Sequence, residues 1–188
     1  MSHSTASRRD LLKAGGLGLL LFNVGGVERW LSPRSARAEA MPLGVLSAPE
    51  VALLEAFGET LLPGAREAGI AHFVDHHLAL PPADSLLMLR YLDVPPPYAP
   101  FYQLGLASLD RVARASAGKP FVDLDSAARD ALVGRISHDN PPGWQGPPAP
   151  LFYFAVRADA VDVVFGTEEG FAKLGIPYLA HIDPPTPW

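Results

Sequence analysis

Clusters of proline divide this chain into short segments. The chain has 188 residues and 20 prolines, with runs at 81–82, 95–97, 141–142 and 147–148. Proline breaks helix interiors and is excluded from central strands. No alternation of apolar and polar residues is sustained, as an exposed sheet would require. We therefore predict an all-α fold, a single small helical domain with proline-rich connectors and an extended C-terminal tail over 177–188.

Apolar residues recur at helical spacing in the segments between these connectors. Ser47 and Glu50 match a capping box at the start of the first helix, and Pro63-Gly64 ends it. Asp125 is placed to cap a later helix. We expect Phe121–Leu124 to be a short extended link. The expected helices cover residues 46–62, 69–80, 83–92, 98–117, 125–137 and 151–166, followed by a short helix through Phe171.

Composition excludes several classes of function. The chain contains no cysteine, which excludes disulfides, thiolate zinc sites, cysteine-ligated iron–sulfur clusters and c-type haem attachment. Its formal net charge is −5, and no basic stripe runs along it. Because neutralisation of phosphates supplies most of the affinity for nucleic acid, we expect no nucleic-acid partner.

The N-terminus resembles an export signal. Arg8 and Arg9 precede an uncharged, glycine-rich stretch, residues 14–27. Two arginines before a modest apolar run are typical of the twin-arginine route, and the stretch is shorter than the roughly 20 residues that span a bilayer. The twin-arginine route moves proteins that are already folded, commonly because a cofactor has been inserted in the cytoplasm. The alternative is an amphipathic N-terminal helix that stays with the fold.

The expected end of this signal lies at two overlapping sites with small residues. They are Ala36-Arg37-Ala38 and Ala38-Glu39-Ala40, so we expect cleavage near Ala38 or Ala40. This divides the chain into a twin-arginine signal peptide, residues 1–40, and a helical small-subunit domain, residues 41–188. The mature protein is then expected to be periplasmic.

One histidine-rich segment has metal-ligand chemistry. His72 and His76 are four residues apart and would share a helix face, with Asp75 beside them. The zinc motif H-E-x-x-H requires glutamate after the first histidine, whereas Phe73 stands there. A stand-alone periplasmic metal-binding or hydrolytic protein that uses His72 and His76 remains an alternative, and a partly exposed helix face explains the segment more simply.

Other catalytic motifs are missing from the sequence, which has no G-x-S-x-G, G-x-G-x-x-G or P-loop pattern. We therefore assign no catalytic, cofactor-binding or metal-binding residue. Aromatic side chains concentrate in the last third of the chain. We expect those of residues 152–165 to complete the core. Trp144, Tyr178 and Trp188, which lie among prolines, are the candidates for a partner interface.

Several short motifs, in this order and spacing, resemble the gluconate 2-dehydrogenase subunit 3 family over most of the mature chain. They are Leu61-Leu62-Pro63-Gly64, Glu67-Ala68-Gly69, Phe73-Val74-Asp75, Gly105-Leu106, Leu109-Asp110, Gly118-Lys119-Pro120-Phe121, Phe152-Tyr153, Val156-Arg157, Val161 and Gly175-Ile176-Pro177-Tyr178. The family's commoner ending has a serine-aspartate-proline and glycine-rich stretch, where this chain has residues 166–171. That departure leaves open which large subunit this chain pairs with.

The resemblance implies a non-catalytic small, or γ, subunit of a bacterial dehydrogenase complex. The large subunit of such a complex, of the glucose–methanol–choline oxidoreductase type, carries FAD and oxidises a sugar, a sugar acid or a related alcohol. A cytochrome c subunit often takes the electrons. The small subunit engages the twin-arginine translocase through its signal, carries the large subunit out and stabilises it. A second alternative is an assembly factor that releases its client after export.

Overall fold

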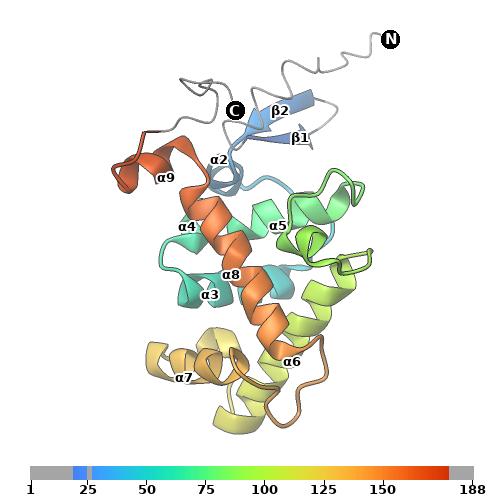
Figure 1. Cartoon of the computed structure of the whole chain (residues 1–188), viewed down its shortest axis with the longest axis vertical. Coiled ribbons are helices and arrows are strands. Elements are labelled where there is room, and N and C mark those ends of the chain that lie inside the picture. The colour runs from blue at the N-terminus through green and yellow to red at the C-terminus, as the bar shows by residue number, and fades with distance from the viewer. Residues whose placement is uncertain (1–18, 25–26, 178–188) are drawn as a thin grey trace, which may run out of the picture.

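The computed structural model of the chain describes residues 19–24 and 27–177 (Figure 1). This part is mostly helical, which confirms the predicted all-α class. The elements in chain order are the strands β1 (Leu20–Val24) and β2 (Val27–Leu31), the helices α2 (Pro33–Ala38), α3 (Ala48–Leu61), α4 (Ala65–Ala68) and α5 (Ile70–Ala79), the 3-10 helix η1 (Met88–Leu92), α6 (Ala99–Ala117), the 3-10 helix η2 (Phe121–Asp123), α7 (Ser126–Ile136), α8 (Ala149–Phe165) and α9 (Glu168–Lys173).

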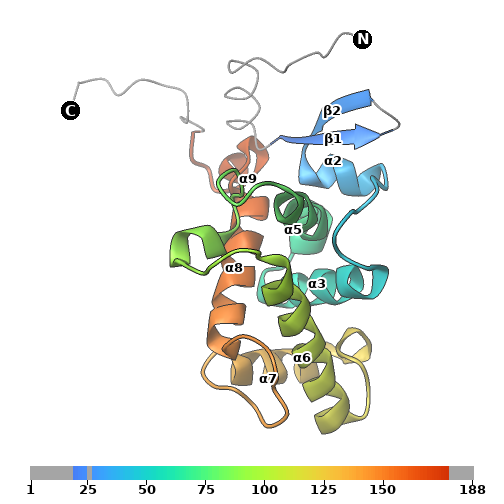
Figure 2. The same ribbon diagram turned by 90° about the vertical axis from the view of Figure 1, so that its right-hand side faces the viewer.

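Helix α8 organises the domain. Figure 1 shows it crossing in front of α3 and α5, and Figure 2, turned by 90°, shows α8 on one side and these helices on the other. It contacts α3, α4, α5, α6, α7 and α9 as well as η1. None of the helices in the described ranges combines the length and the apolar character that crossing a bilayer requires.

Aromatic rings fill the centre of the core between α3, α6 and α8. Phe57 of α3 stacks on Phe152 of α8 at a centroid distance of 5.3 Å and meets Phe121 edge-on at 6.1 Å. Gly105 of α6 faces the ring of Phe152 so closely that a Cβ there would overlap the ring atoms. A glycine is therefore required where α6 crosses α8, because any side chain would push the two helices apart.

Local capping signals place the starts of α3 and α7 where the sequence predicts them. Ser47 and Glu50 form the capping box of α3, in which a Glu50 carboxylate oxygen accepts a hydrogen bond of 2.8 Å from the backbone N–H of Ser47. The Asp125 carboxylate accepts from the N–H of Ala128 at 2.8 Å to cap α7. Thr167 caps α9 in the same way.

Two connectors differ from the prediction. The expected helix over 83–92 is wrong, because only Met88–Leu92 is helical and its form is 3-10. The expected extended link at 121–124 is also wrong, since Phe121–Asp123 forms a 3-10 turn. In both connectors burial of apolar side chains decides the backbone: Leu87 and Leu89 are fully buried in the first, and Phe121 is fully buried in the second.

The described fold begins upstream of residue 40, the predicted boundary. β1 and β2 form a two-stranded antiparallel hairpin in which Leu20 lies opposite Leu31. Helix α2 follows and contacts α4 and α5; Figure 2 shows it beside α5. The side chains of Pro33 and Ala36 are buried there, so residues expected to belong to a removable leader contribute to the core.

Candidate functional site

The histidines of α5 are engaged inside the protein. The Nε2 atom of His72 lies 3.2 Å from the carbonyl oxygen of Met41, and burial lowers the pKa of the imidazole. His76 lies beside the ring of Phe22 at a centroid distance of 5.2 Å, and burial lowers its pKa as well. The imidazoles of His72 and His76 thus contact different groups and do not converge on one point where a metal could bind.

His77 is the most strongly perturbed of the three. Its Nδ1 accepts a hydrogen bond of 3.3 Å from the backbone N–H of Leu86, so it anchors the connector that follows α5. Burial, together with the neighbouring His76, lowers its pKa from 6.5 to about 3. His77 is therefore neutral at neutral pH and acts as a structural acceptor.

The carboxylate of Asp75 is already occupied by backbone. One oxygen accepts from the N–H of Gly44 at 2.8 Å, and the other accepts from Val45 and Leu46 at 2.9 and 2.7 Å. Three backbone donors on one carboxylate tie the chain before α3 to the side of α5. Within the described ranges, no group of three or more His, Cys, Asp or Glu side chains is arranged to hold a metal ion.

A second buried polar group lies between α6, α8 and η1. The hydroxyl of Tyr102 donates to one carboxylate oxygen of Asp159 at 2.5 Å, and the backbone N–H of Met88 donates to the other at 3.0 Å. Burial raises the pKa of Asp159 to about 7, although both hydrogen bonds act in the opposite direction. Burial and the neighbouring Asp159 raise the pKa of Tyr102 well above its ordinary value. Because both side chains are fully buried, the pair is structural and does not reach a substrate.

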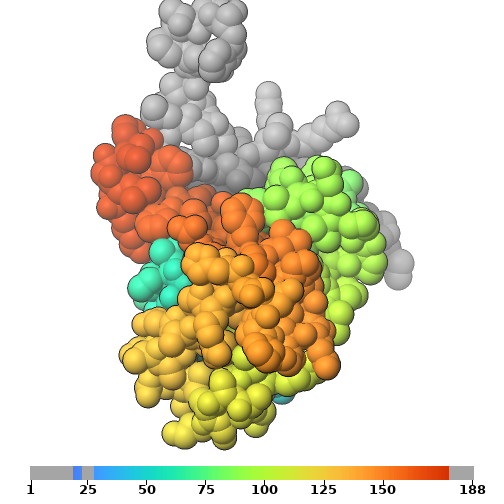
Figure 3. All heavy atoms as spheres, turned by 60° about the horizontal axis from the view of Figure 1, so that its bottom comes forward, coloured from blue at the N-terminus to red at the C-terminus, as the bar shows by residue number. Residues whose placement is uncertain are grey.

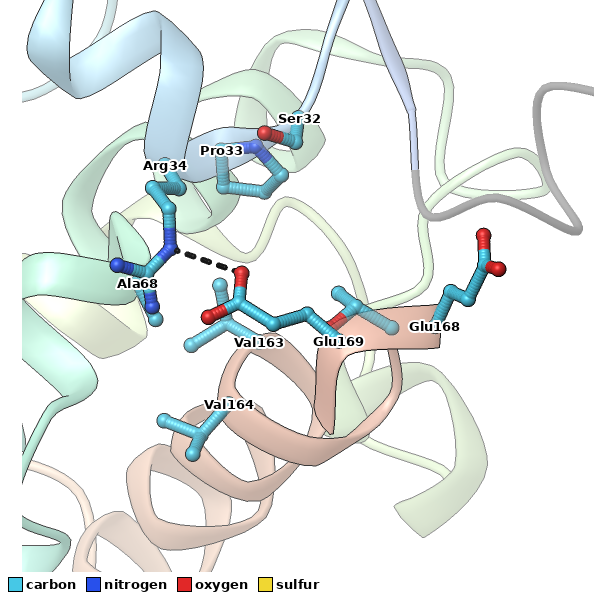
Figure 4. A pocket seen from close by; sticks show the side chains of 9 residues that line it. Ser32, Pro33, Arg34, Ala68, Val163, Val164, Glu168 and Glu169 are labelled. Carbon is cyan, nitrogen blue, oxygen red and sulfur yellow. Dashed lines mark ion pairs between the residues drawn. The ribbon is translucent and has the colours of Figure 1, made fainter. Parts of the chain in front are cut away.

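A cleft of about 250 Å³ lies where α2 meets the end of α8 and the start of α9. Figure 4 shows Arg34 and Glu169 pointing toward one another across it, with Nε and a carboxylate oxygen 3.5 Å apart, while Glu168 points away. Arg34 also pairs with Glu67 of α4. The hydrogen bond from Lys173, and then Arg34, lower the pKa of Glu169. Among the described residues these charges pair with one another, and they link α2 to α4 and α9 at the cleft.

The surface feature that points most clearly to an interaction is the outer face of α8. Phe154 is 46% exposed and Val161 is 40% exposed. They are seven residues apart, so they share one face of the helix. The opposite face holds Phe152, Val156 and Asp159 in the core. Figure 3 shows the orange segment that includes α8 at the surface, next to the green segment that includes η1. We call Phe154 and Val161 the outer α8 face.

An apolar outer face is unusual for a surface helix. The polar side of a surface helix ordinarily faces solvent; α8 exposes the charged Arg157 and Asp162 together with the apolar Phe154 and Val161. Exposed apolar side chains of this kind mark interaction sites. The sequence predicts that the aromatic residues of 152–165 complete the core, but only the inner side of α8 is buried. The outer side was not predicted, although the apolar residues Phe154 and Val161, on the side opposite Phe152 and Val156, were the signal that indicated it.

The residues predicted to contact a partner or a translocase are described only in part. Trp144 is half-buried, its indole N–H donates to the carbonyl oxygen of Pro147 at 2.6 Å, and its ring lies 5.9 Å from that of Phe152. It therefore packs mainly against its own chain. Tyr178 and Trp188 lie outside the described residues, as do Arg8 and Arg9.

The fold and this surface define a class: a small helical domain whose central helix presents an apolar face outward, as the subunits of stable complexes do. The chain belongs to the gluconate 2-dehydrogenase subunit 3 family, whose family model matches residues 48–181. It is thus a member of a family of dehydrogenase-complex subunits. Neither the search of curated proteins nor that of solved structures gives a match.

Proposed function

We propose that this chain is a non-catalytic small subunit that binds an FAD-bearing large subunit of the glucose–methanol–choline oxidoreductase type, accompanies it through twin-arginine export and stabilises it in the periplasm. The complex oxidises a sugar, a sugar acid or a related alcohol, and a cytochrome c subunit is a further candidate partner. The observation that carries the proposal is the outer α8 face in a chain whose family consists of complex subunits.

The outer α8 face suits the centre of such an interface. Aromatic and aliphatic side chains that become fully desolvated supply most of the binding energy of protein interfaces, and Phe154 supplies an aromatic anchor of this kind. Arg157, which is exposed between Phe154 and Val161, adds a guanidinium group able to form bidentate pairs with carboxylates. The face belongs to a rigid helix, so little conformational entropy is lost when a partner covers it.

A double variant tests this surface. Phe154→Gln with Val161→Gln removes the apolar face and keeps good helix formers. Leu104→Gln is the matched control, because Leu104 is a comparably exposed apolar residue on α6. In co-expression with the large subunit, we expect the double variant to recover at least about tenfold less flavoprotein, a loss of about 1.4 kcal/mol or more, and Leu104→Gln to recover the wild-type amount. Equal recovery by the double variant and wild type contradicts the proposed surface.

The proposed role in export rests on the sequence of the predicted signal peptide. Replacing both Arg8 and Arg9 with lysine keeps the charge and removes the guanidinium groups. We expect the double lysine variant to leave both subunits in the cytoplasm, as measured by fractionation and by dehydrogenase activity in the periplasmic fraction. If the flavoprotein reaches the periplasm at its usual level, this chain does not carry it.

A further inference from the structure

Helix α2 packs against the rest of the domain through two buried side chains. Ala36 is 0% exposed and Pro33 is buried. α2 contacts α4 and α5, and Figure 2 shows it lying over the same end of the molecule as α5. The segment therefore fills space that would otherwise open onto the core.

The contact between α2 and the segment before α5 is made by backbone. Gly69 has φ of +88°, and a Cβ at this position would overlap the carbonyl group of Pro33. Only glycine combines this conformation with so close an approach. Gly64 has a similar φ of +93° but has nothing within 4 Å of its Cβ position. Gly69 therefore differs from Gly64 in having α2 packed against it.

Ion pairs and hydrogen bonds fix the orientation of α2. Arg34 pairs with Glu67 and Glu169, and Arg37 pairs with Glu55 at 3.1 Å. Each pair is partly exposed and individually weak. Together they attach the six-residue helix to α3, α4 and α9, and Arg34 and Glu169 also line the cleft in Figure 4.

The chain stays attached after α2 ends. The backbone N–H of Met41 donates to the carbonyl oxygen of Ala36 at 2.9 Å, and the Met41 side chain is buried. Its carbonyl oxygen faces His72, and the next three anchored N–H groups are those that Asp75 holds. After α2 the chain is thus anchored to α5 at Met41 and again at Gly44, Val45 and Leu46.

We infer that both small-residue sites, 36–38 and 38–40, are closed to signal peptidase in the folded chain, and that α2 remains as the first helix of the mature domain. A protease must bind its substrate as an accessible, extended strand. Ala36 is buried in a helix, and Met41, which follows the second site, is buried as well. Ala38, Glu39 and Ala40 are exposed, but their backbone forms the end of α2 and a turn instead of an extended strand. The N–H groups of Glu39, Ala40 and Met41 donate to the carbonyl oxygens of Ser35, Arg37 and Ala36. Cleavage at either site therefore requires local unfolding of α2.

The proposed export route serves here only to identify the protease. Retention of α2 excludes the cleavage near Ala38 or Ala40 that the sequence predicts. Because the twin-arginine route moves folded proteins, the leader would meet the peptidase with α2 already packed. Retention of α2 also makes the Arg34 cleft a permanent part of the subunit.

Proteolysis of purified protein tests the inference independently of export. The folded full-length chain and a peptide covering residues 30–46 are incubated with purified signal peptidase in detergent and analysed by intact mass. We expect cleavage of the peptide and at least about a hundredfold slower cleavage of the folded chain. Folded chain that yields products beginning at Glu39 or Met41 at the rate of the peptide overturns the inference.

A pair of variants assigns the protection to α2. Gly69→Ala forces α2 away, whereas Gly64→Ala carries the same positive-φ penalty without that clash. We expect Gly69→Ala to be cut at least about tenfold faster than Gly64→Ala. Equal rates show that the contact of α2 with Gly69 does not protect the sites, and they overturn the inference.

A truncation provides a second measurement that needs no protease. The chain beginning at Met41 is compared by thermal unfolding with the chain beginning at Val27, which keeps α2. We expect the shorter chain to unfold about 5 °C lower or more, because the surface under Pro33 and Ala36 becomes exposed. Equal unfolding temperatures show that α2 is dispensable and contradict the inference. If the flavoprotein still reaches the periplasm in the lysine variant test but these results hold, only the proposed function is lost.

Discussion

The Tyr102 hydroxyl donates a 2.5 Å hydrogen bond to the Asp159 carboxylate, and both side chains are fully buried. The other Asp159 oxygen accepts from Met88, so one carboxylate joins α6, α8 and η1. A buried carboxylate costs desolvation, and here two donors offset part of that cost. The pair holds the connector after Pro82 against α8, the helix that also carries the outer face.

Removing the carboxylate should weaken this junction. Asp159→Ala leaves the Tyr102 hydroxyl and the Met88 N–H buried without a partner, and we expect a loss of about 2–4 kcal/mol in the free energy of unfolding. Asp159→Asn keeps a carbonyl acceptor and should lose less. Urea unfolding at pH 7 measures both. If the free energies of unfolding of Asp159→Ala and wild type differ by less than about 0.5 kcal/mol, the hydrogen bonds do not have this role.

The same carboxyl should make stability fall as pH rises. Burial raises its pKa from 3.8 to about 7. Between these values the unfolded state has lost the proton while the folded state keeps it, so the free energy of unfolding decreases with rising pH and levels off above about 7. The effect is at most about 4 kcal/mol. The difference between wild type and Asp159→Asn should follow this course in unfolding experiments from pH 4 to 8, and a difference independent of pH refutes it.

His77 should act in the opposite direction. Its pKa falls from 6.5 to about 3 on folding, chiefly through burial. Between these values the unfolded state binds the proton and the folded state does not, so its contribution to stability rises with pH and is lost as pH falls below 6.5. His77→Asn keeps an acceptor near Nδ1 and does not titrate. We expect it to reduce the destabilisation between pH 6.5 and 4 by on the order of 2 kcal/mol; an acid unfolding profile identical to wild type contradicts this.

The crossing of α6 and α8 can be tested with two glycines. Gly105→Ala forces a methyl group into the Phe152 ring, and we expect it to cost about 2–3 kcal/mol through overpacking. Gly134 of α7 is also within a helix but has open space at its Cβ position. Gly134→Ala should therefore stabilise by about 0.5–1 kcal/mol. Denaturant unfolding of the pair checks both signs, and a neutral Gly105→Ala contradicts the close crossing.

Features decided within a few residues could be predicted from the sequence. The capping box of Ser47 and Glu50 and the cap at Asp125 fix helix starts through bonds that span three residues. The helical class follows from periodicity and proline spacing. The 3-10 turns at Met88–Leu92 and Phe121–Asp123 could not be predicted in this way, because contacts far along the chain hold them: Asp159 binds the first and Asp110 accepts from the N–H of Phe121 in the second.

The candidate site was predicted less well than the fold, for a physical reason. Periodicity identifies an apolar stripe but does not say which side of an apolar helix another helix covers. The outer α8 face can be identified only once it is known which helices of the chain pack against α8. Trp144 illustrates the converse, since its surroundings in the sequence suggest an exposed anchor while its indole packs against Phe152. The export assignment of Arg8 and Arg9 remains a prediction.

The central claim is that this chain stays bound to a flavoprotein. The most direct measurement is purification of the C-terminally tagged chain from the periplasm, followed by native mass determination and flavin absorbance of the same sample. The account predicts a stoichiometric complex of this chain with one larger, FAD-containing subunit. A colourless, monomeric chain, or a flavoprotein that is exported but recovered without it, contradicts the account; the first result indicates a stand-alone protein and the second a factor that releases its client.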